Sequence, residues 1–234
     1  KDVLFVSLEM SRKEILAKSI SRNTLIKVLE EGKKADLAKS VNDILSGSRY
    51  KNYSDEEVRI IQAATQMYCS YGNHIFIMEG EGEATVSTIR KAALDQMSAT
   101  GNVPVIIVDY LQILSPLMQR STDKQKVDKS VLELKRLSRD LETTVFVLSS
   151  LSRSTYTEEV DMHSYKESGN IEYSADVLLG LDMKGVGSKT FDIGKAKREN
   201  PRAIEISIIK SRNSEVGGRI SCRYYPKFNY IQEG

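Results

Sequence analysis

The chain has 234 residues, of which 40% are hydrophobic, so it can form one large domain or two small ones around a sizeable core. Its formal net charge of +2, from 34 basic and 32 acidic residues, gives no overall attraction to nucleic acid or membranes. The cysteines and histidines stand far apart, which argues against a disulfide framework, a zinc site and a metalloprotease. No apolar run reaches the roughly 20 residues of a membrane span. We therefore expect a cytoplasmic protein without a membrane partner.

The N-terminal part of the chain predicts a buried strand followed by helices. The strand covers the apolar run 2–8 and is followed directly by Glu9. Serine residues mark two helix starts, since Ser11 is a typical N-cap and Ser54 opens a capping box. A further helix is expected at 33–45.

The middle of the chain alternates between short apolar strands and amphipathic helices. Strands are expected at 75–78, 103–108 and 145–148, and helices at 85–98 and 127–141. This alternation is typical of an α/β fold in which a mostly parallel sheet carries helices on both faces.

The last third of the chain, from Asp176 onward, contains strand candidates with little helix between them. They cover 177–183, 204–209 and 219–224. This pattern predicts that the sheet ends in antiparallel hairpins. Because the sequence has no internal repeat and no low-complexity linker, we expect a single domain over residues 1–234.

Polar residues at the ends of apolar strands are the candidates for chemistry. Asp109 follows the strand at 103–108 and is a candidate Walker B acid that holds a nucleotide-bound Mg²⁺, although many strands end in aspartate simply as a cap. Glu9 and Ser150 also follow buried strands. Because the carboxyl ends of parallel strands form the ligand-binding rim of such sheets, the three residues together favour a nucleotide site.

The segment from Lys184 to Arg223 is locally basic. It contains ten Lys and Arg residues against four acids, a local balance of +6. Such a block is typical either of a face that binds nucleic acid or phosphate or of a solvated edge of a β-rich region.

Five segments, in order along the chain, resemble motifs of DnaB-type replicative helicases. They are VLFVSLEM at 3–10, IIVDYLQ at 106–112, LSSLSR at 148–153, KESGNIEYSAD at 166–176 and IKSRN at 209–213. Each string alone is moderately specific, but the ordered set is highly specific and covers nearly the whole chain. The resemblance is to the RecA-like C-terminal ATPase domain of that family. It implies a P-loop NTPase core with a mostly parallel sheet flanked by helices.

The resemblance implies roles for five residues around ATP and Mg²⁺. Glu9 matches the family's catalytic glutamate, which activates the attacking water, and Asp109 matches its Walker B aspartate, which holds the metal. Lys210 and Arg212 match a basic pair that reaches the neighbouring subunit's ATP site, with Arg212 as the arginine finger. Ser150 stands where the family usually has a glutamine that senses the γ-phosphate. A finger supplied in trans implies a homo-oligomeric ring, expected to be a hexamer.

The resemblance also implies a DNA-binding loop. Lys166, Glu167 and Gly169 match a loop that in this family lines the central channel and binds the backbone of single-stranded DNA. Without the resemblance, an ordinary surface turn would be the favoured interpretation. The implied function is ATP-driven 5′ to 3′ movement along single-stranded DNA and duplex unwinding during replication. Primase and a helicase loader would be further partners, in the cytoplasm of a bacterium or of a phage-infected host.

The chain departs from the family pattern at three places. The phosphate loop Gly-x-x-x-x-Gly-Lys-Ser/Thr is absent, and the string at 185–190, with no helix expected behind it, is interpreted as a hairpin loop. Because the chain begins at Lys1 without methionine, we expect a domain truncated at its N-terminus that is inactive alone. Ser150 is shorter than the usual glutamine. Lys166 replaces an arginine, which keeps the charge but loses the bidentate fork.

Two alternative functions stay open at this stage. One is a RecA- or KaiC-type ATPase that does not unwind DNA. The other is a non-catalytic, degenerate helicase-like interaction module.

Overall fold

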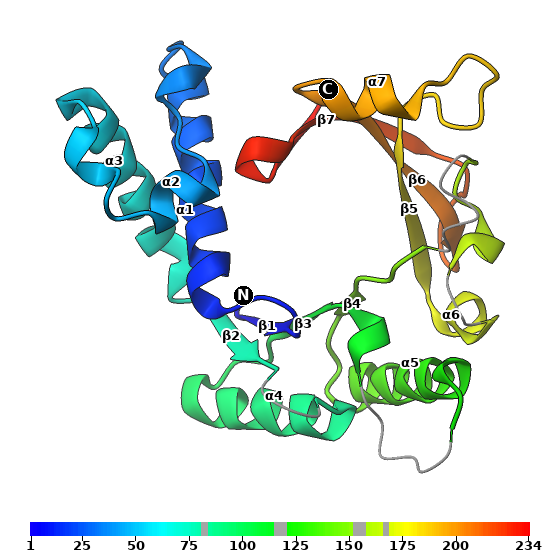
Figure 1. Cartoon of the computed structure of the whole chain (residues 1–234). Coiled ribbons are helices and arrows are strands. Elements are labelled where there is room, and N and C mark those ends of the chain that lie inside the picture. The colour runs from blue at the N-terminus through cyan, green and yellow to red at the C-terminus, as the bar shows by residue number, and fades with distance from the viewer. Residues whose placement is uncertain (81–83, 115–120, 152–157, 166–168) are drawn as a thin grey trace.

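The computed structural model describes residues 1–80, 84–114, 121–151, 158–165 and 169–234 (Figure 1). Its first sheet has the strand order β2-β1-β3-β4, and its three pairings are all parallel. The strands are β1 (Val3–Ser7), β2 (Ile75–Glu79), β3 (Val105–Asp109) and β4 (Val145–Val147). They are short runs rich in valine and isoleucine, which favour the pleated, half-buried surface of a sheet. The predicted parallel sheet is therefore confirmed.

Five helices of this part begin with the same device, a capping box in which a serine or threonine side chain accepts a hydrogen bond from the third amide of the helix. The helices are α1 (Arg12–Glu30), α2 (Val41–Leu45), α3 (Asp55–Gly72), α4 (Val86–Thr100) and α5 (Asp123–Asp140). The N-caps are Ser11, Ser40, Ser54, Thr85 and Thr122. The predicted starts at Ser11 and Ser54 are confirmed.

The helix expected at 33–45 is shorter in the structure. Residues Ala35–Leu37 form a single 3₁₀ turn, and α2 begins only at Val41. The reason is Ser40, whose extended backbone and capping side chain start a new helix at a point where the prediction continued an old one.

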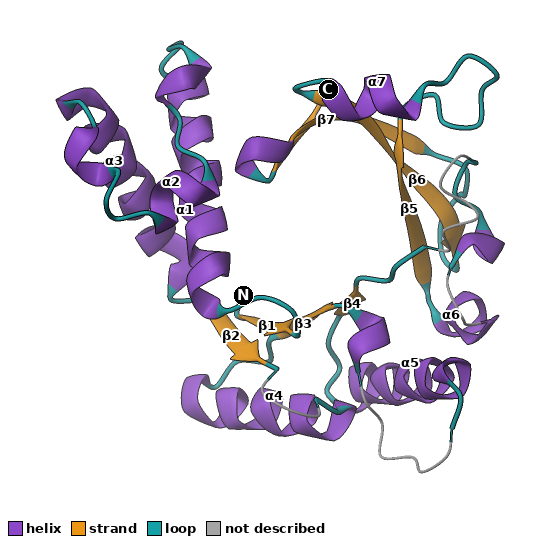
Figure 2. Ribbon diagram, in the orientation of Figure 1, coloured by secondary structure: helices purple, strands orange, loops and turns teal. Residues whose placement is uncertain are grey.

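The main core lies between one face of the parallel sheet and helices α4 and α5 (Figure 2). Leu4, Val6, Ile106 and Val108 alternate along β1 and β3 and are buried on this face. The opposite face is only partly covered, in contrast with the helices that we expected on both faces, and Phe146 there is 55% exposed. Helices α1 and α3 pack against each other and stand beside the sheet (Figure 1).

The C-terminal strands form a sheet of their own, with the order β5-β6-β7-β8 and antiparallel pairing throughout. Its strands are β5 (Val177–Met183), β6 (Arg202–Ser211), β7 (Arg219–Tyr225) and β8 (Tyr230–Glu233). The antiparallel hairpins are thus confirmed, but they do not extend the parallel sheet. Within the described residues, β4 and β5 are each the last strand of their sheet and have one unpaired edge.

A second apolar cluster ties the C-terminal sheet to the N-terminal helices. The turn Pro226–Phe228 between β7 and β8 places Phe228 among Leu25, Val28 and Ile60 of α1 and α3 (Figure 1). Phe228 is 4% exposed. Two short helices complete this half, α6 (Gly169–Ser174) and α7 (Ile193–Arg198). None of the helices in the described residues is long and apolar enough to cross a membrane.

Helix α5 offers a direct test of the main core. Leu137 is fully buried against the parallel sheet, whereas Leu132 on the same helix is 46% exposed. We expect Leu137→Ala to lower the free energy of unfolding by about 2–5 kcal/mol, because it leaves a cavity. Leu132→Ala should change it by no more than about 0.5 kcal/mol. Urea unfolding followed by circular dichroism measures both, and equal losses would contradict this account of the core.

Candidate functional site

The carboxyl ends of the parallel strands meet at one cavity of about 370 Å³. It is lined by Glu9, Asp109, Tyr110, Leu148, Ser149 and Ser150. The structure therefore brings together three of the residues singled out in the sequence, Glu9, Asp109 and Ser150. Their roles stay predictions, because geometry alone does not assign them.

Backbone pairing explains why these residues converge. In the register of β1 and β3, Ser7 lies opposite Asp109, and the Leu8 amide continues the pairing by donating to the Asp109 carbonyl at 2.9 Å. The Leu148 amide in turn donates to the carbonyl of Val108 at 3.0 Å. The three chain segments thus leave the sheet side by side, and the residues that follow them share one rim.

Asp109 carries an unusual charge environment. Burial raises the pKa of its carboxyl above the ordinary value, and the Glu9 carboxylate raises the pKa further, against a lowering by Lys18. A half-buried carboxylate beside a second acid favours a cation, and carboxylate oxygens are the ligands that Mg²⁺ prefers. The described residues contain no group of three or more potential metal ligands. This matches the way Mg²⁺ is commonly held, by one or two carboxylates together with waters and substrate phosphates.

Gln112 is a residue of this rim to which the sequence assigned no role. Its amide nitrogen donates to the Ser149 hydroxyl at 2.9 Å, and its amide oxygen accepts from the Ser150 backbone at 3.2 Å. Gln112 therefore fixes the segment that carries Ser150. The only sequence signal was its position three residues after Asp109.

Lys210 and Arg212 do not line this cavity. They lie at and just beyond the end of β6 and contact α6: Lys210 donates from Nζ to the Glu172 carbonyl, and Arg212 donates from Nη2 to the Tyr173 carbonyl at 3.1 Å. The predicted basic pair is thus separated from Glu9 and Asp109 within one chain.

The predicted DNA-binding residues are only partly within reach of the structure. Lys166 and Glu167 lie outside the described residues. Gly169 is the first residue of α6.

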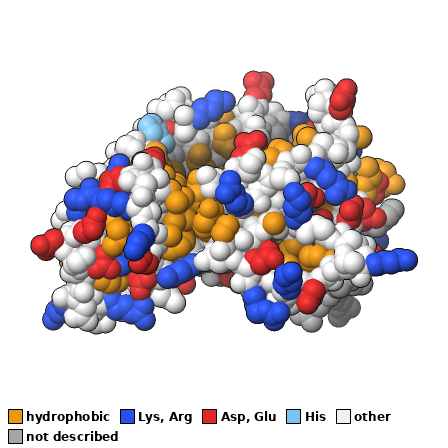
Figure 3. Space-filling model, turned by 90° about the horizontal axis from the view of Figure 1, so that it is seen from above, with side chains coloured by type: hydrophobic (Ala, Val, Ile, Leu, Met, Phe, Trp, Pro, Cys, Tyr) orange, Lys and Arg blue, Asp and Glu red, His pale blue; other side chains and the backbone are white. Residues whose placement is uncertain are grey.

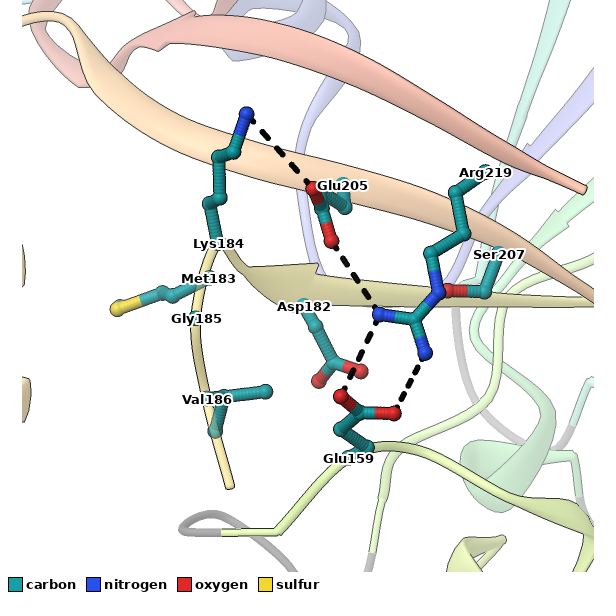
Figure 4. A pocket seen from close by; sticks show the side chains of 9 residues that line it. All are labelled: Glu159, Asp182, Met183, Lys184, Gly185, Val186, Glu205, Ser207 and Arg219. Atoms are coloured by element: carbon teal, nitrogen blue, oxygen red, sulfur yellow. Dashed lines mark hydrogen bonds and ion pairs between the residues drawn. The ribbon is translucent and has the colours of Figure 1, made fainter. Parts of the chain in front are cut away.

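A second cavity, of about 240 Å³, lies on the antiparallel sheet (Figure 4). Arg219 points into it and pairs with Glu159 at 2.6 Å and with Glu205 at 3.5 Å. Burial raises the pKa of the Asp182 carboxyl, and the neighbouring carboxylates raise it further. Sequence reasoning did not find this cluster, because its members come from three separate segments and follow no short motif.

The basic block at 184–223 is partly neutralised in the structure. Lys184 and Arg219 pair with Glu205, and Arg212 pairs with Asp176. On the face seen from above, basic and acidic side chains are mixed rather than separated (Figure 3). These pairings favour the solvated-edge interpretation for this part of the block.

The loop at 185–190 differs from expectation in one respect, because a helix, α7, does follow it. The correction does not restore a phosphate loop. Gly185 and Gly187 adopt positive φ angles of 83° and 82° in consecutive turns. At the start of α7, the Asp192 side chain already accepts from the Lys195 amide, so an acid occupies the position that an anion would need.

The raised pKa of Asp109 predicts a pH-dependent effect on stability. Between the ordinary pKa of 3.8 and the higher folded value, the native state binds more protons than the unfolded state, so its stability falls as pH rises through that window. We expect Asp109→Asn to raise the urea midpoint at pH 7, with a gain that disappears as pH approaches 3.8. Asp95→Asn, on the exposed side of α4, is the control and should leave the midpoint unchanged. A lower midpoint for Asp109→Asn at pH 7 would refute the argument.

Comparison with known proteins places this geometry in a family. The sequence model of the DnaB-like helicase C terminal domain matches residues 1–233. The replicative DNA helicase DnaC of Bacillus subtilis is 33% identical over 149 residues, which are 62% of this chain and 31% of that protein. A probable replicative DNA helicase of Trieres chinensis is 22% identical over 98% of this chain and 47% of its own length. The chain spans less than half the length of these relatives.

Two solved structures share the fold. A DnaB-like replicative helicase, described with its interactions with primase, superposes with a TM-score of 0.77 at 22% identity, over 99% of this chain and 50% of that one. An ATPase domain solved by itself gives a TM-score of 0.76 at 22% identity, over 99% of this chain and 74% of that one. At this identity the structural likeness shows the fold alone, whereas the family model matches nearly the whole sequence. The chain belongs to the family of DnaB-like helicase C-terminal domains.

Proposed function

We propose that this chain is the motor domain of a ring-forming replicative DNA helicase. It would couple ATP hydrolysis to 5′ to 3′ movement on single-stranded DNA and to duplex unwinding. The observation that carries the proposal is the meeting of Glu9 and Asp109 at the carboxyl ends of two paired parallel strands. This is the place where α/β sheets bind ligands.

The nucleotide roles follow from the environment of each side chain. Asp109 is the residue that would hold Mg²⁺, because its half-buried carboxylate has no protein cation paired to it in the described residues. Glu9 is exposed at the same cavity and would orient the attacking water and take its proton. Ser150, held by Gln112, would contact a phosphate at shorter reach than a glutamine.

The missing phosphate loop has a structural counterpart in the two open sheet edges. The exposed apolar residues beside them are Phe146, Leu148, Val177, Leu179 and Leu181. Apolar side chains also gather near the middle of the face seen from above (Figure 3). Since the unpaired edges of β4 and β5 are open to a further strand, a segment that carries a phosphate loop could pair there and complete the site. The solved ATPase domain, of which this chain covers 74%, has further residues without a counterpart here.

The assembly follows from the position of the basic pair. Because Lys210 and Arg212 lie away from their own chain's cavity, we infer that they act on the nucleotide of a neighbouring subunit in a ring, expected to be a hexamer. Single-stranded DNA would pass the segment of Lys166, Glu167 and Gly169. Primase and a loader are proposed as further partners, in a bacterial or phage-infected cytoplasm.

Hydrolysis tests the nucleotide site. The 234-residue chain should show no ATP turnover, because its sequence lacks the phosphate loop. The same chain joined to a preceding segment with a Gly-x-x-x-x-Gly-Lys-Ser/Thr loop should hydrolyse ATP, and Glu9→Gln in that protein should lower kcat by about 10²- to 10⁴-fold. A phosphate-release assay measures this. Robust turnover by the 234-residue chain would contradict the assignment, and an inactive extended chain would favour the non-catalytic interaction module.

Binding to a labelled oligonucleotide tests the DNA role. Lys166→Glu should weaken single-stranded DNA binding and reduce the slope of log affinity against log salt by about 0.7 for each phosphate that is no longer neutralised. Fluorescence anisotropy at several salt concentrations measures both. Lys124→Glu, an exposed lysine at the start of α5, is the matched control. Equal effects of the two changes would point to the alternative ATPase that does not bind DNA through this loop.

A further inference from the structure

The segment 158–165, which directly precedes the predicted DNA-binding residues, is fastened to β5. The Val160 amide donates to Asp182 Oδ2 at 2.8 Å, and the Tyr165 hydroxyl donates to the Leu179 carbonyl at 2.8 Å. Val160 is buried against Gly180, where a Cβ atom would lie 3.0 Å from a Val160 methyl group. The glycine on β5 therefore creates the space that receives this segment.

An ion pair strengthens this upstream attachment. Arg219 of β7 holds the Glu159 carboxylate through both Nη atoms, at 2.6 and 3.4 Å (Figure 4). The pKa of Glu159 is lowered, first by this hydrogen bond and then by the charge of Arg219. The segment is thus bound to β5 by hydrogen bonds and packing and to β7 by charge.

The downstream attachment is made by the basic pair. Helix α6 begins at Gly169, and its last carbonyl groups have no partner within so short a helix. Lys210 and Arg212 supply donors to two of them, at Glu172 and Tyr173. Cations at a helix C-terminus also interact favourably with the helix dipole.

The local backbone explains how both cations reach α6. The pairing of β5 with β6 shifts register between Leu178 and Leu179, so Ile209 is an extra residue on β6 directly before Lys210. The Arg212 amide donates to the Asp176 carbonyl at 3.0 Å. The Asp176 side chain pairs with Arg212 and with Lys135 of α5. Both cations are therefore anchored next to the end of α6.

We propose that Lys210 and Arg212 are positioning residues for α6 in their own subunit, and that they thereby link the neighbour's nucleotide to the DNA-binding segment. The segment from 158 to 174 is held upstream by Arg219, Asp182 and Gly180 and downstream by the pair. The link, though not the attachment itself, rests on the proposed function of the pair. Any movement of these two side chains toward a neighbouring phosphate changes the support of α6.

Hydrogen exchange in the 234-residue chain tests the attachment without nucleotide or ring. In the double variant Lys210→Ala, Arg212→Ala we expect amide protection at 169–175 to fall about tenfold or more, as for the loss of hydrogen bonds to charged groups. The conservative double variant Lys210→Arg, Arg212→Lys should keep most of it. Arg219→Ala is the matched control, expected to loosen 158–161 only. Unchanged exchange at 169–175 in the alanine variant, or an equal loss in Arg219→Ala, overturns the proposal.

Single-stranded DNA affinity of the same variants tests the link. The alanine double variant should bind more weakly than the wild type, in the absence of ATP, where an arginine finger acting only in trans has no effect. Lost protection at 169–175 with unchanged affinity overturns the link. If Lys166→Glu also leaves affinity unchanged, the DNA role in the proposed function fails, while the exchange result still decides the attachment.

Discussion

The parallel register between β1 and β3 is the constraint on which the site depends. It sets Ser7 opposite Asp109, and the hydrogen bond from Leu8 carries the pairing one residue past the strand ends. Because side chains alternate across a sheet, a slip of one residue would turn the buried set outward and aim Asp109 away from Glu9. Burial of the alternating aliphatic residues against α4 and α5 fixes this register. The hydrophobic core and the chemical site are therefore specified by the same strands.

The site is built at a cost in stability. Asp109 is partly buried near a second carboxylate, and its raised pKa records the unfavourable free energy of charging it there. Such an uncompensated charge is typical of functional positions, since a purely structural acid would be paired or capped. Gln112, by contrast, serves only to hold the Ser149–Ser150 segment in place. The rim thus combines a rigid frame with one charge left for a cation.

The antiparallel sheet acts as a frame that joins distant parts of the chain. Its last turn inserts Phe228 into the cluster of α1 and α3, Arg219 holds the segment before the DNA-binding residues, and Lys210 and Arg212 hold α6 after them. In a ring motor, a subunit interface and a DNA contact must influence each other. Two side chains at the end of β6 offer a short physical path for this coupling, since they contact α6 directly.

The sequence by itself determined the elements whose signals are local. Apolar strands, capping boxes and the placement of Glu9 and Asp109 directly at strand ends all depend on neighbouring residues, and the ordered motifs identified the family. Only the tertiary structure decided that the antiparallel strands form a separate sheet, that Arg219 pairs with Glu159, and that Lys210 contacts α6. These side-chain contacts join residues about 40 to 60 positions apart. Periodicity reports which face of an element is buried, but strand register and long-range packing choose its partner.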